Sequence, residues 1–235
     1  MGTKMAEEQS AEQVREKHLR DMGPDLGPVY HELWNEVTWL HAKWNQYRQL
    51  FGYSRQRVEL LNKVASHFFR IVQDALWDDV ILHLARLTDP LKSGGKANLS
   101  LRRLPKVISD ATLKREVESL IEVALSTSLF VRDLRNRKLA HIDLALALKT
   151  GVEPIPGVSR DKVEAALSAV RAVLNKLEAY YWESETAYEH FIAMGGEGDT
   201  LIYFMRAGLR AEDSRRERLR QGRPVPEDFR HDEEA

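Results

Sequence analysis

Apolar residues recur every three or four positions along most of this chain, and this spacing constrains the fold more than any other feature of the sequence. Such spacing places apolar side chains on one face of an α-helix, whereas a strand buried on one side needs them at every second position. Alternating strand patterns and repeats of a fixed period are absent from the sequence. The spacing therefore predicts an all-α fold, a bundle of long antiparallel helices.

Glycine, proline and capping residues divide this pattern into separate helices. Proline fits the first turn of a helix, so we expect a first core helix from Pro28 to Tyr47. Ser54 is placed to cap a second helix that ends near Asp89-Pro90. The pattern then predicts a short helix around 104–108, capped by Ser100, and a helix over 111–130. A further helix is expected from Ser159 to Tyr188, ending before Gly195. Asp199 is expected to cap the last helix.

The length of 235 residues and the hydrophobic content of 43% favour one core, because domains usually contain roughly 100–200 residues. Apolar positions are sparse at the start of the chain, and charge dominates its end. We therefore expect a charged N-terminal arm over 1–28, one helical domain over 29–212, and a charged, disordered tail over 213–235. Both termini are expected to be flexible.

Charge and composition exclude several classes of function. A net charge of −1 argues against a protein that coats nucleic acid nonspecifically, since that mode needs a broadly cationic surface. The absence of cysteine excludes disulfides and thiolate chemistry, and it is typical of a reducing compartment. The N-terminus lacks the apolar core of a secretory signal, and no run of about 18 apolar residues occurs. We expect a cytoplasmic protein without a membrane-spanning segment.

The stretch 134–141, with sequence LRNRKLAH, carries the clearest chemical signal. Arg135 and Asn136 are followed by His141 six positions after the arginine. An arginine can bind phosphate oxygens bidentately, and a histidine can transfer a proton near neutral pH. Together these two side chains suffice for RNA cleavage without a metal. Without further context, a surface salt bridge or a capping role is the better explanation of the pair.

The spacing of this pair has a geometric consequence. On an ideal helix, six residues separate Arg135 from His141 by about 240° and about 9 Å, so the two side chains would face apart. Their convergence on one phosphate requires either a break in the helix or a second copy of the segment supplied by a symmetric partner. A break is plausible because Asn136 favours turns and Asp143 can cap a new helical turn.

Additional cations make the segment locally positive, and we expect them to attract neighbouring phosphates of a substrate. An alternative is that they are solvated residues at a helix end, where the helix dipole favours positive charge. These flanking cations are Arg132, Arg137 and Lys138, opposed by Asp133.

Other polar residues of the sequence favour structural roles. Arg86 is expected to form an ion pair with Asp89 or Asp79. The remaining histidines lack the spacing of zinc-binding helices, so we expect neither a metal site nor a cofactor.

The motif resembles the signature of the HEPN superfamily, which is an arginine followed by a polar residue and then by a histidine after four to six intervening residues. Arg135-Asn136 and His141 match it. The wider sequence resembles the phage abortive-infection AbiU-type branch of that superfamily, over roughly residues 33–209. The segments that carry this resemblance are Trp77-Asp78-Asp79, Leu84 through Pro90, Asn98 through Leu101, and Leu134 through Asp143.

The resemblance implies a HEPN-like helical domain that forms a homodimer and brings two copies of the motif into one cleft. Many relatives are metal-independent endoribonucleases that act in phage defence or as toxins. By this resemblance the catalytic residues are Arg135, Asn136 and His141, the substrate is RNA, and no cofactor or metal is needed. The cations Arg132, Arg137 and Lys138 would bind the substrate.

Two alternatives stay open at the level of sequence. The chain can be a non-catalytic HEPN module that binds a nucleotide, RNA or a protein partner, because a fold does not by itself imply an activity. It can also be the toxin of a pair, silenced by a cognate antitoxin protein.

Overall fold

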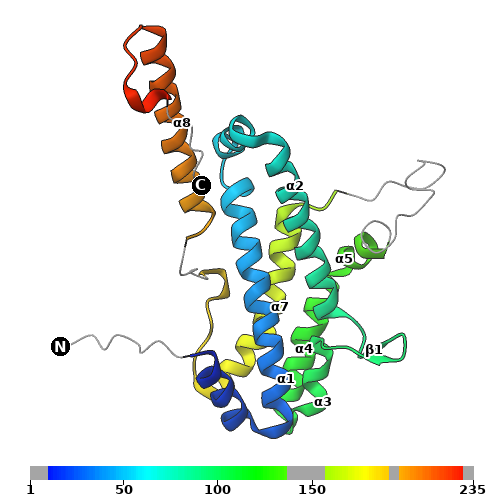
Figure 1. Ribbon diagram of the computed structural model, residues 1–235. Coiled ribbons are helices and arrows are strands. Elements are labelled where there is room, and N and C mark those ends of the chain that lie inside the picture. The colour runs from blue at the N-terminus through cyan, green and yellow to red at the C-terminus, as the bar shows by residue number, and fades with distance from the viewer. Residues whose placement is uncertain (1–9, 137–156, 191–195, 230–235) are drawn as a thin grey trace, which may run out of the picture. The chain divides into compact units, whose positions relative to one another are not determined.

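The computed structural model describes residues 10–136, 157–190 and 196–229 (Figure 1). These residues are almost entirely helical, which confirms the predicted all-α bundle. They group into two compact units. The first lies within Met1–Trp44 and Trp77–Phe191, and the second within Asn45–Leu76 and Ile192–Ala235. In the ranges described, no helix combines the length and the apolar character needed to cross a bilayer.

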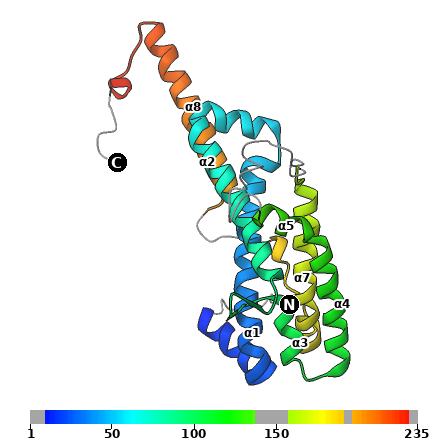
Figure 2. The ribbon, with the colours of Figure 1, turned by 90° about the vertical axis from the view of Figure 1, so that its right-hand side faces the viewer.

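The first unit is built around α4 (Ala111–Thr127) and α7 (Arg160–Trp182), which pack side by side (Figures 1 and 2). The buried face of α4 repeats at three- and four-residue spacing, as the sequence predicts. Most of α1 (Ala11–Tyr47) and the end of α2 (Arg55–Thr88) complete this unit. Its most deeply buried apolar residues include Leu33, Leu40, Trp44, Ile81, Leu84, Val117, Val170 and Leu174.

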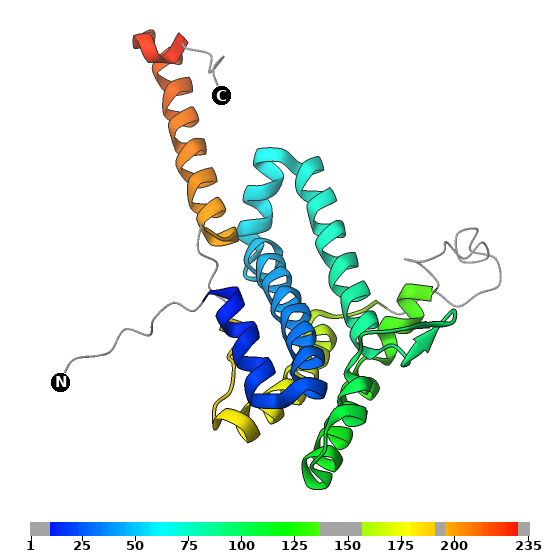
Figure 3. The same ribbon diagram turned by 60° about the horizontal axis from the view of Figure 1, so that its bottom comes forward.

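The start of α1 differs from the expected loose arm. Helix begins at Ala11, breaks at Gly23, whose φ is 79°, and resumes at Pro24. The segment before the break folds back along the segment after it (Figure 3). Gly27 allows this close approach, because a Cβ there would lie 2.7 Å from the backbone oxygen of His18. The sequence pattern missed this packing because aromatic contacts of the buried His18 ring stabilise it, rather than an apolar stripe.

Short elements connect α2 to α5 (Leu129–Leu134). The glycine-rich connector forms a hairpin of β1 (Lys92–Ser93) and β2 (Lys96–Ala97), where we predicted no strand. It is followed by the 3₁₀ turn η2 (Leu101–Arg103) and by α3 (Leu104–Val107). The helix expected over 111–130 is interrupted at Ser128, so that α4 and α5 are separate.

The second unit contains the first part of α2, a π-helical turn η1 (Arg48–Gly52), α8 (Gly198–Arg220) and the 3₁₀ turn η5 (Pro226–Phe229). The N-cap of α8 is Glu197 in a reciprocal box with Thr200, not Asp199 as predicted. α8 continues past residue 212, and Arg218 forms an ion pair with Asp228. Helix and the 3₁₀ turn η5 thus extend over part of the range predicted as a disordered tail, and the boundaries of that tail stay a prediction.

Two more helix ends can be compared with their predictions. α2 ends at Thr88, as expected from the proline two residues later. α7 ends at Trp182, several residues before the predicted end, and Glu183 there adopts the left-handed conformation with φ 50°. Tyr188 belongs instead to the short turn η4 (Tyr188–His190). The expected stop at Gly195 lies outside the described residues.

Candidate functional site

Helix α5, which carries the start of the motif, lies beside the C-terminal part of α2 (Figures 1 and 2). Two arginines attach it there. Arg132 donates from Nη2 to the backbone oxygen of Thr88 at 2.7 Å. Arg135 donates from Nη1 to the carboxylate of Asp89 at 2.7 Å. The last carbonyls of a helix have no partner within the helix, and cations bind there favourably. The two contacts therefore fix the end of α5 on the end of α2.

The turn that carries Asp89 is itself held in place. The hydroxyl of Thr88 donates back to the carbonyls of Leu84 and Ala85, and the amide of Asn98 donates to the carbonyl of Pro90 at 2.8 Å. These hydrogen bonds close the chain on both sides of Asp89. The carboxylate that contacts Arg135 is consequently presented by a rigid turn.

Arg135 keeps hydrogen-bonding capacity beyond this ion pair. Its guanidinium has five N–H groups, of which Nη1 contacts Asp89 and Nε contacts the side-chain oxygen of Asn136 at 3.2 Å. No other partner of this guanidinium is found among the described residues. The side chain is 27% exposed, against 15% for Asp89. Toward the described residues, its other N–H groups therefore meet no acceptor, and phosphate oxygens are acceptors that a guanidinium binds well.

Asn136 lies directly beside this guanidinium. Its side chain is exposed, and its oxygen accepts the hydrogen bond from Arg135, which leaves its amide N–H groups able to donate. Arg135 and Asn136 begin a π-helical turn after α5 ends at Leu134. The structure thus brings together two of the three predicted catalytic residues.

Of the other four predicted site residues, the structure describes Arg132. His141, Arg137 and Lys138 lie outside the described residues, so their placement stays a prediction. Arg132, predicted to bind substrate, has a structural contact through its hydrogen bond to Thr88. That contact occupies one of its five N–H groups and does not preclude a second contact with phosphate.

The expected ion pairs of Arg86 are wrong. Asp89 pairs with Arg135, and Asp79 pairs with Lys43 of α1 at 2.7 Å, while Arg86 is exposed. Sequence reasoning therefore missed Asp89 as the partner of the motif arginine, because a contact across 46 positions leaves no periodic signal. The position of Asp89 immediately before a proline, at a predicted helix end, is the one hint that the sequence offers.

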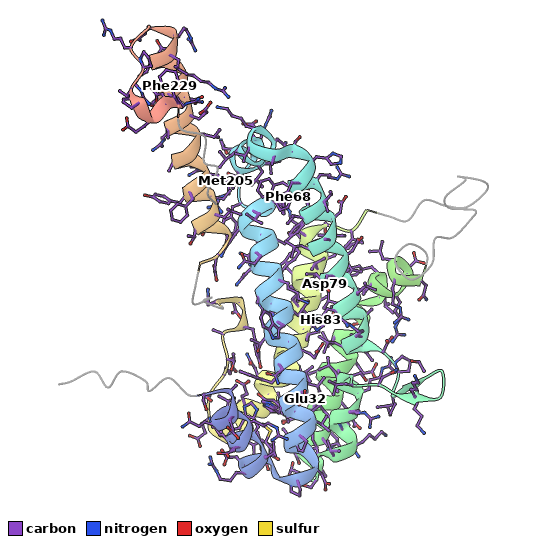
Figure 4. All side chains as sticks on the ribbon, in the orientation of Figure 1. Glu32, Phe68, Asp79, His83, Met205 and Phe229 are labelled. Carbon is purple, nitrogen blue, oxygen red and sulfur yellow. The ribbon has the colours of Figure 1, made fainter. Side chains whose placement is uncertain are left out.

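A second group of polar side chains links α1 to α2, and its members on α2 are Asp79 and His83 (Figure 4). His83 is 4% exposed at its side chain, and its Nε2 lies 2.5 Å from the carboxylate of Glu36. Burial lowers the pKa of His83, which outweighs the opposing effect of Glu36. The neutral imidazole then donates to Glu36. This arrangement, together with the Lys43 and Asp79 pair, stabilises the packing of the two helices.

Within the described ranges, no cluster of three or more His, Asp or Glu side chains is arranged to bind a metal ion.

Comparison with known proteins gives one family. The model of a HEPN family described as AbiU2 matches residues 24–194, a span that includes α1 after its break, the whole motif and α7. Comparisons with curated proteins and with solved structures found no match.

Proposed function

Since the chain belongs to the AbiU2 family of HEPN proteins, we propose that this abortive-infection domain is a metal-independent endoribonuclease that acts in phage defence or as a toxin. The observation that supports the proposal most directly is the guanidinium of Arg135. It is oriented by Asp89 and Asn136, it is partly exposed, and it retains N–H groups for a phosphate.

The reaction follows from the chemistry of the motif. His141 accepts the proton of a ribose 2′-hydroxyl, whose oxygen attacks the adjacent phosphorus. The bond from phosphorus to the 5′-oxygen breaks, and that oxygen takes a proton from the partner's His141 or from water. Arg135 stabilises the negative charge that grows on the phosphorane oxygens. The products are a 2′,3′-cyclic phosphate and a free 5′-hydroxyl.

The proposal includes a homodimer and a protein partner. A homodimer would supply the second copy of the motif that the spacing of Arg135 and His141 calls for. A cognate antitoxin would hold such an enzyme inactive until infection. RNA is the substrate in either case.

Incubation of the full-length protein with RNA in the presence of EDTA tests this function. We expect the wild type to produce fragments with 2′,3′-cyclic phosphate ends, detected by their resistance to periodate and their sensitivity to a cyclic phosphodiesterase. His141→Ala and Arg135→Ala are expected to lower the rate by at least about 100-fold.

The matched control is His67→Ala, because His67 is exposed on α2 and lies outside the motif. It should cleave at the wild-type rate. Equal cleavage by wild type and His141→Ala would remove His141 as the general base. Absence of cleavage by the pure wild type, with RNA still bound, would identify a non-catalytic RNA-binding module instead.

A further inference from the structure

The first unit contains a pocket of about 330 Å³ next to the candidate site. Its volume is at the small end of the range of about 300–1,000 Å³ that is typical of small-molecule sites. Three segments form its walls: the turn that follows α2, the η2 and α3 segment, and one face of α4. The apolar part of the lining includes Pro90, Pro105 and Ile121. Such surfaces suit the faces of a flat ring.

The polar part of the lining combines hydrogen-bond donors and acceptors. Arg102 lines the pocket, and its Nε is buried without a hydrogen-bond partner. Lys106 lies one turn further on the same segment. Glu118 and Glu122 lie one turn apart on α4, so both carboxylates reach the same side. No ion pair between described residues occupies any of these four side chains. A buried unpaired donor is costly, and a ligand with an acceptor would satisfy it.

One wall of the pocket is adjacent in the chain to Asp89, the ion-pair partner of the motif arginine. Pro90 lines the pocket, and the residue before it is Asp89, which contacts Arg135 at 2.7 Å. Neighbouring Cα atoms are about 3.8 Å apart, so this wall of the pocket begins directly beside the residue that holds the guanidinium. A ligand group in the pocket and a phosphate at Arg135 can therefore belong to the same RNA strand.

From this arrangement we propose that the pocket binds a guanine base of the RNA substrate, next to the phosphate held by Arg135. Guanine presents two adjacent donors, N1–H and the N2 amino group, which match the two oxygens of a glutamate. Its O6 and N7 are acceptors that match an arginine. Adenine lacks the adjacent donors, and uracil has a single N–H donor. Single-stranded RNA is commonly read in this way, through unstacked bases hydrogen-bonded at their edges.

This inference rests on the proposed function, because it identifies the substrate of the same site. It is tested first by binding, without catalysis. The full-length protein is titrated with each of the four 5′-ribonucleoside monophosphates, which lack the 3′-phosphodiester that the proposed reaction cleaves. Saturation-transfer NMR measures each affinity. We expect 5′-GMP to bind about tenfold more tightly than AMP, CMP or UMP.

The double variant Glu118→Gln/Glu122→Gln should lose this preference. Both residues are exposed on α4 and glutamine has a similar helix propensity, so the fold is expected to be retained. Arg102→Gln should weaken GMP binding as well. The matched controls are Glu185→Gln and Arg115→Gln, which change the same charges at exposed positions away from the pocket lining. Circular dichroism verifies that each variant is folded.

Equal affinity for all four nucleotides, no saturable binding, or an undiminished GMP preference in the double variant would each overturn the proposal. Mapping of RNA cleavage separates its failure from that of the proposed function. Guanine-selective binding without RNA cleavage would retain the pocket and reject the ribonuclease. Cleavage with no preference for sites next to guanine, and no preference for GMP, would retain the ribonuclease and reject the pocket.

Discussion

Asp89 both orients Arg135 and competes with the substrate for it. A carboxylate within 2.7 Å fixes the guanidinium in one direction, so little conformational entropy is lost when a phosphate binds. The same carboxylate repels the phosphate. Because it contacts only Nη1, the guanidinium can bind both anions through different N–H groups. We infer that Asp89 is a positioning residue for the motif.

The stability contribution of this ion pair can be measured with Asp89→Asn. The pair is largely shielded from water, and its loss leaves a half-buried guanidinium without its charged partner. We expect a loss of about 1–2 kcal/mol in the free energy of unfolding. The control is Asp74→Asn, which removes the partner of Arg70 in an exposed pair and should cost at most about 0.5 kcal/mol. Urea unfolding measures both, and equal losses would contradict a stabilising role for Asp89.

A buried histidine makes stability depend on pH. His41 is 2% exposed and its Nε2 has no hydrogen-bond partner. Burial, assisted by Arg171, lowers the pKa of His41 from 6.5 to about 4. Between pH 6.5 and pH 4, the unfolded chain therefore binds more protons at His41 than the folded chain does. The free energy of unfolding falls as the pH decreases through this window, and His41 does not affect it at higher pH. The fall due to His41 is about 2 kcal/mol between pH 7 and pH 4.5.

The comparison of His41→Phe with the wild type isolates this contribution. Between pH 7 and pH 4.5, the free energy of unfolding of the variant should fall by about 2 kcal/mol less than that of the wild type. His67→Phe serves as the control, because His67 is exposed, and it should keep the wild-type dependence. Urea unfolding of the three proteins at both pH values gives the three differences in the free energy of unfolding. A wild-type dependence in His41→Phe would show that the acid sensitivity arises from other groups.

Among the elements, the N-terminal part of α1 depends on the closeness of two backbones. Gly27→Ala places a Cβ 2.7 Å from both the oxygen of His18 and the Cα of Leu19, so the backbone must move. We expect the free energy of unfolding to fall by about 1–3 kcal/mol. Gly208→Ala is the matched control in α8, where a Cβ meets open space, and it should gain about 0.5–1 kcal/mol. Thermal unfolding followed by circular dichroism measures both, and a tolerated alanine at Gly27 would refute the close approach.

The sequence predicted elements whose signals are local. The end of α2 at Thr88 and the cap of α7 by Ser159 follow from proline and serine at fixed offsets, and both are confirmed. Ser100 was predicted to cap the helix around 104–108, but the N-cap of α3 is Arg103. Ser100 precedes the 3₁₀ turn η2 instead, and its buried hydroxyl has no hydrogen-bond partner among the described residues. The fold-back before Gly23 could not be predicted, because it depends on contacts between residues far apart in the sequence.

The candidate site shows the same division between local and distant information. Arg135 and Asn136 are neighbours in sequence, and the structure keeps their side chains in contact. The attachment of Arg132 and Arg135 to the end of α2 joins residues more than 40 positions apart and has no sequence signature. The pocket lined by Arg102 and Glu122 likewise arises only when separate segments fold together.

For the whole molecule, the decisive question is which subunit supplies each catalytic group. An unbroken α-helix from Arg135 would point His141 about 240° away from the guanidinium. A symmetric dimer solves this problem, because the two-fold axis can place the histidine of one subunit beside the arginine of the other. Each dimer then has two composite sites.

Mixing two inactive variants distinguishes a composite site from a site within one subunit. Arg135→Ala and His141→Ala homodimers each lack one essential group in both sites. A mixed dimer retains one complete site if Arg135 of one subunit acts with His141 of the other and water protonates the leaving group. With random exchange of subunits, half of the dimers are mixed, so the mixture should regain about a quarter of the wild-type rate of RNA cleavage. No recovery, with subunit exchange verified by differently tagged chains, would place both groups of each site in the same subunit and require a break in the helix between them.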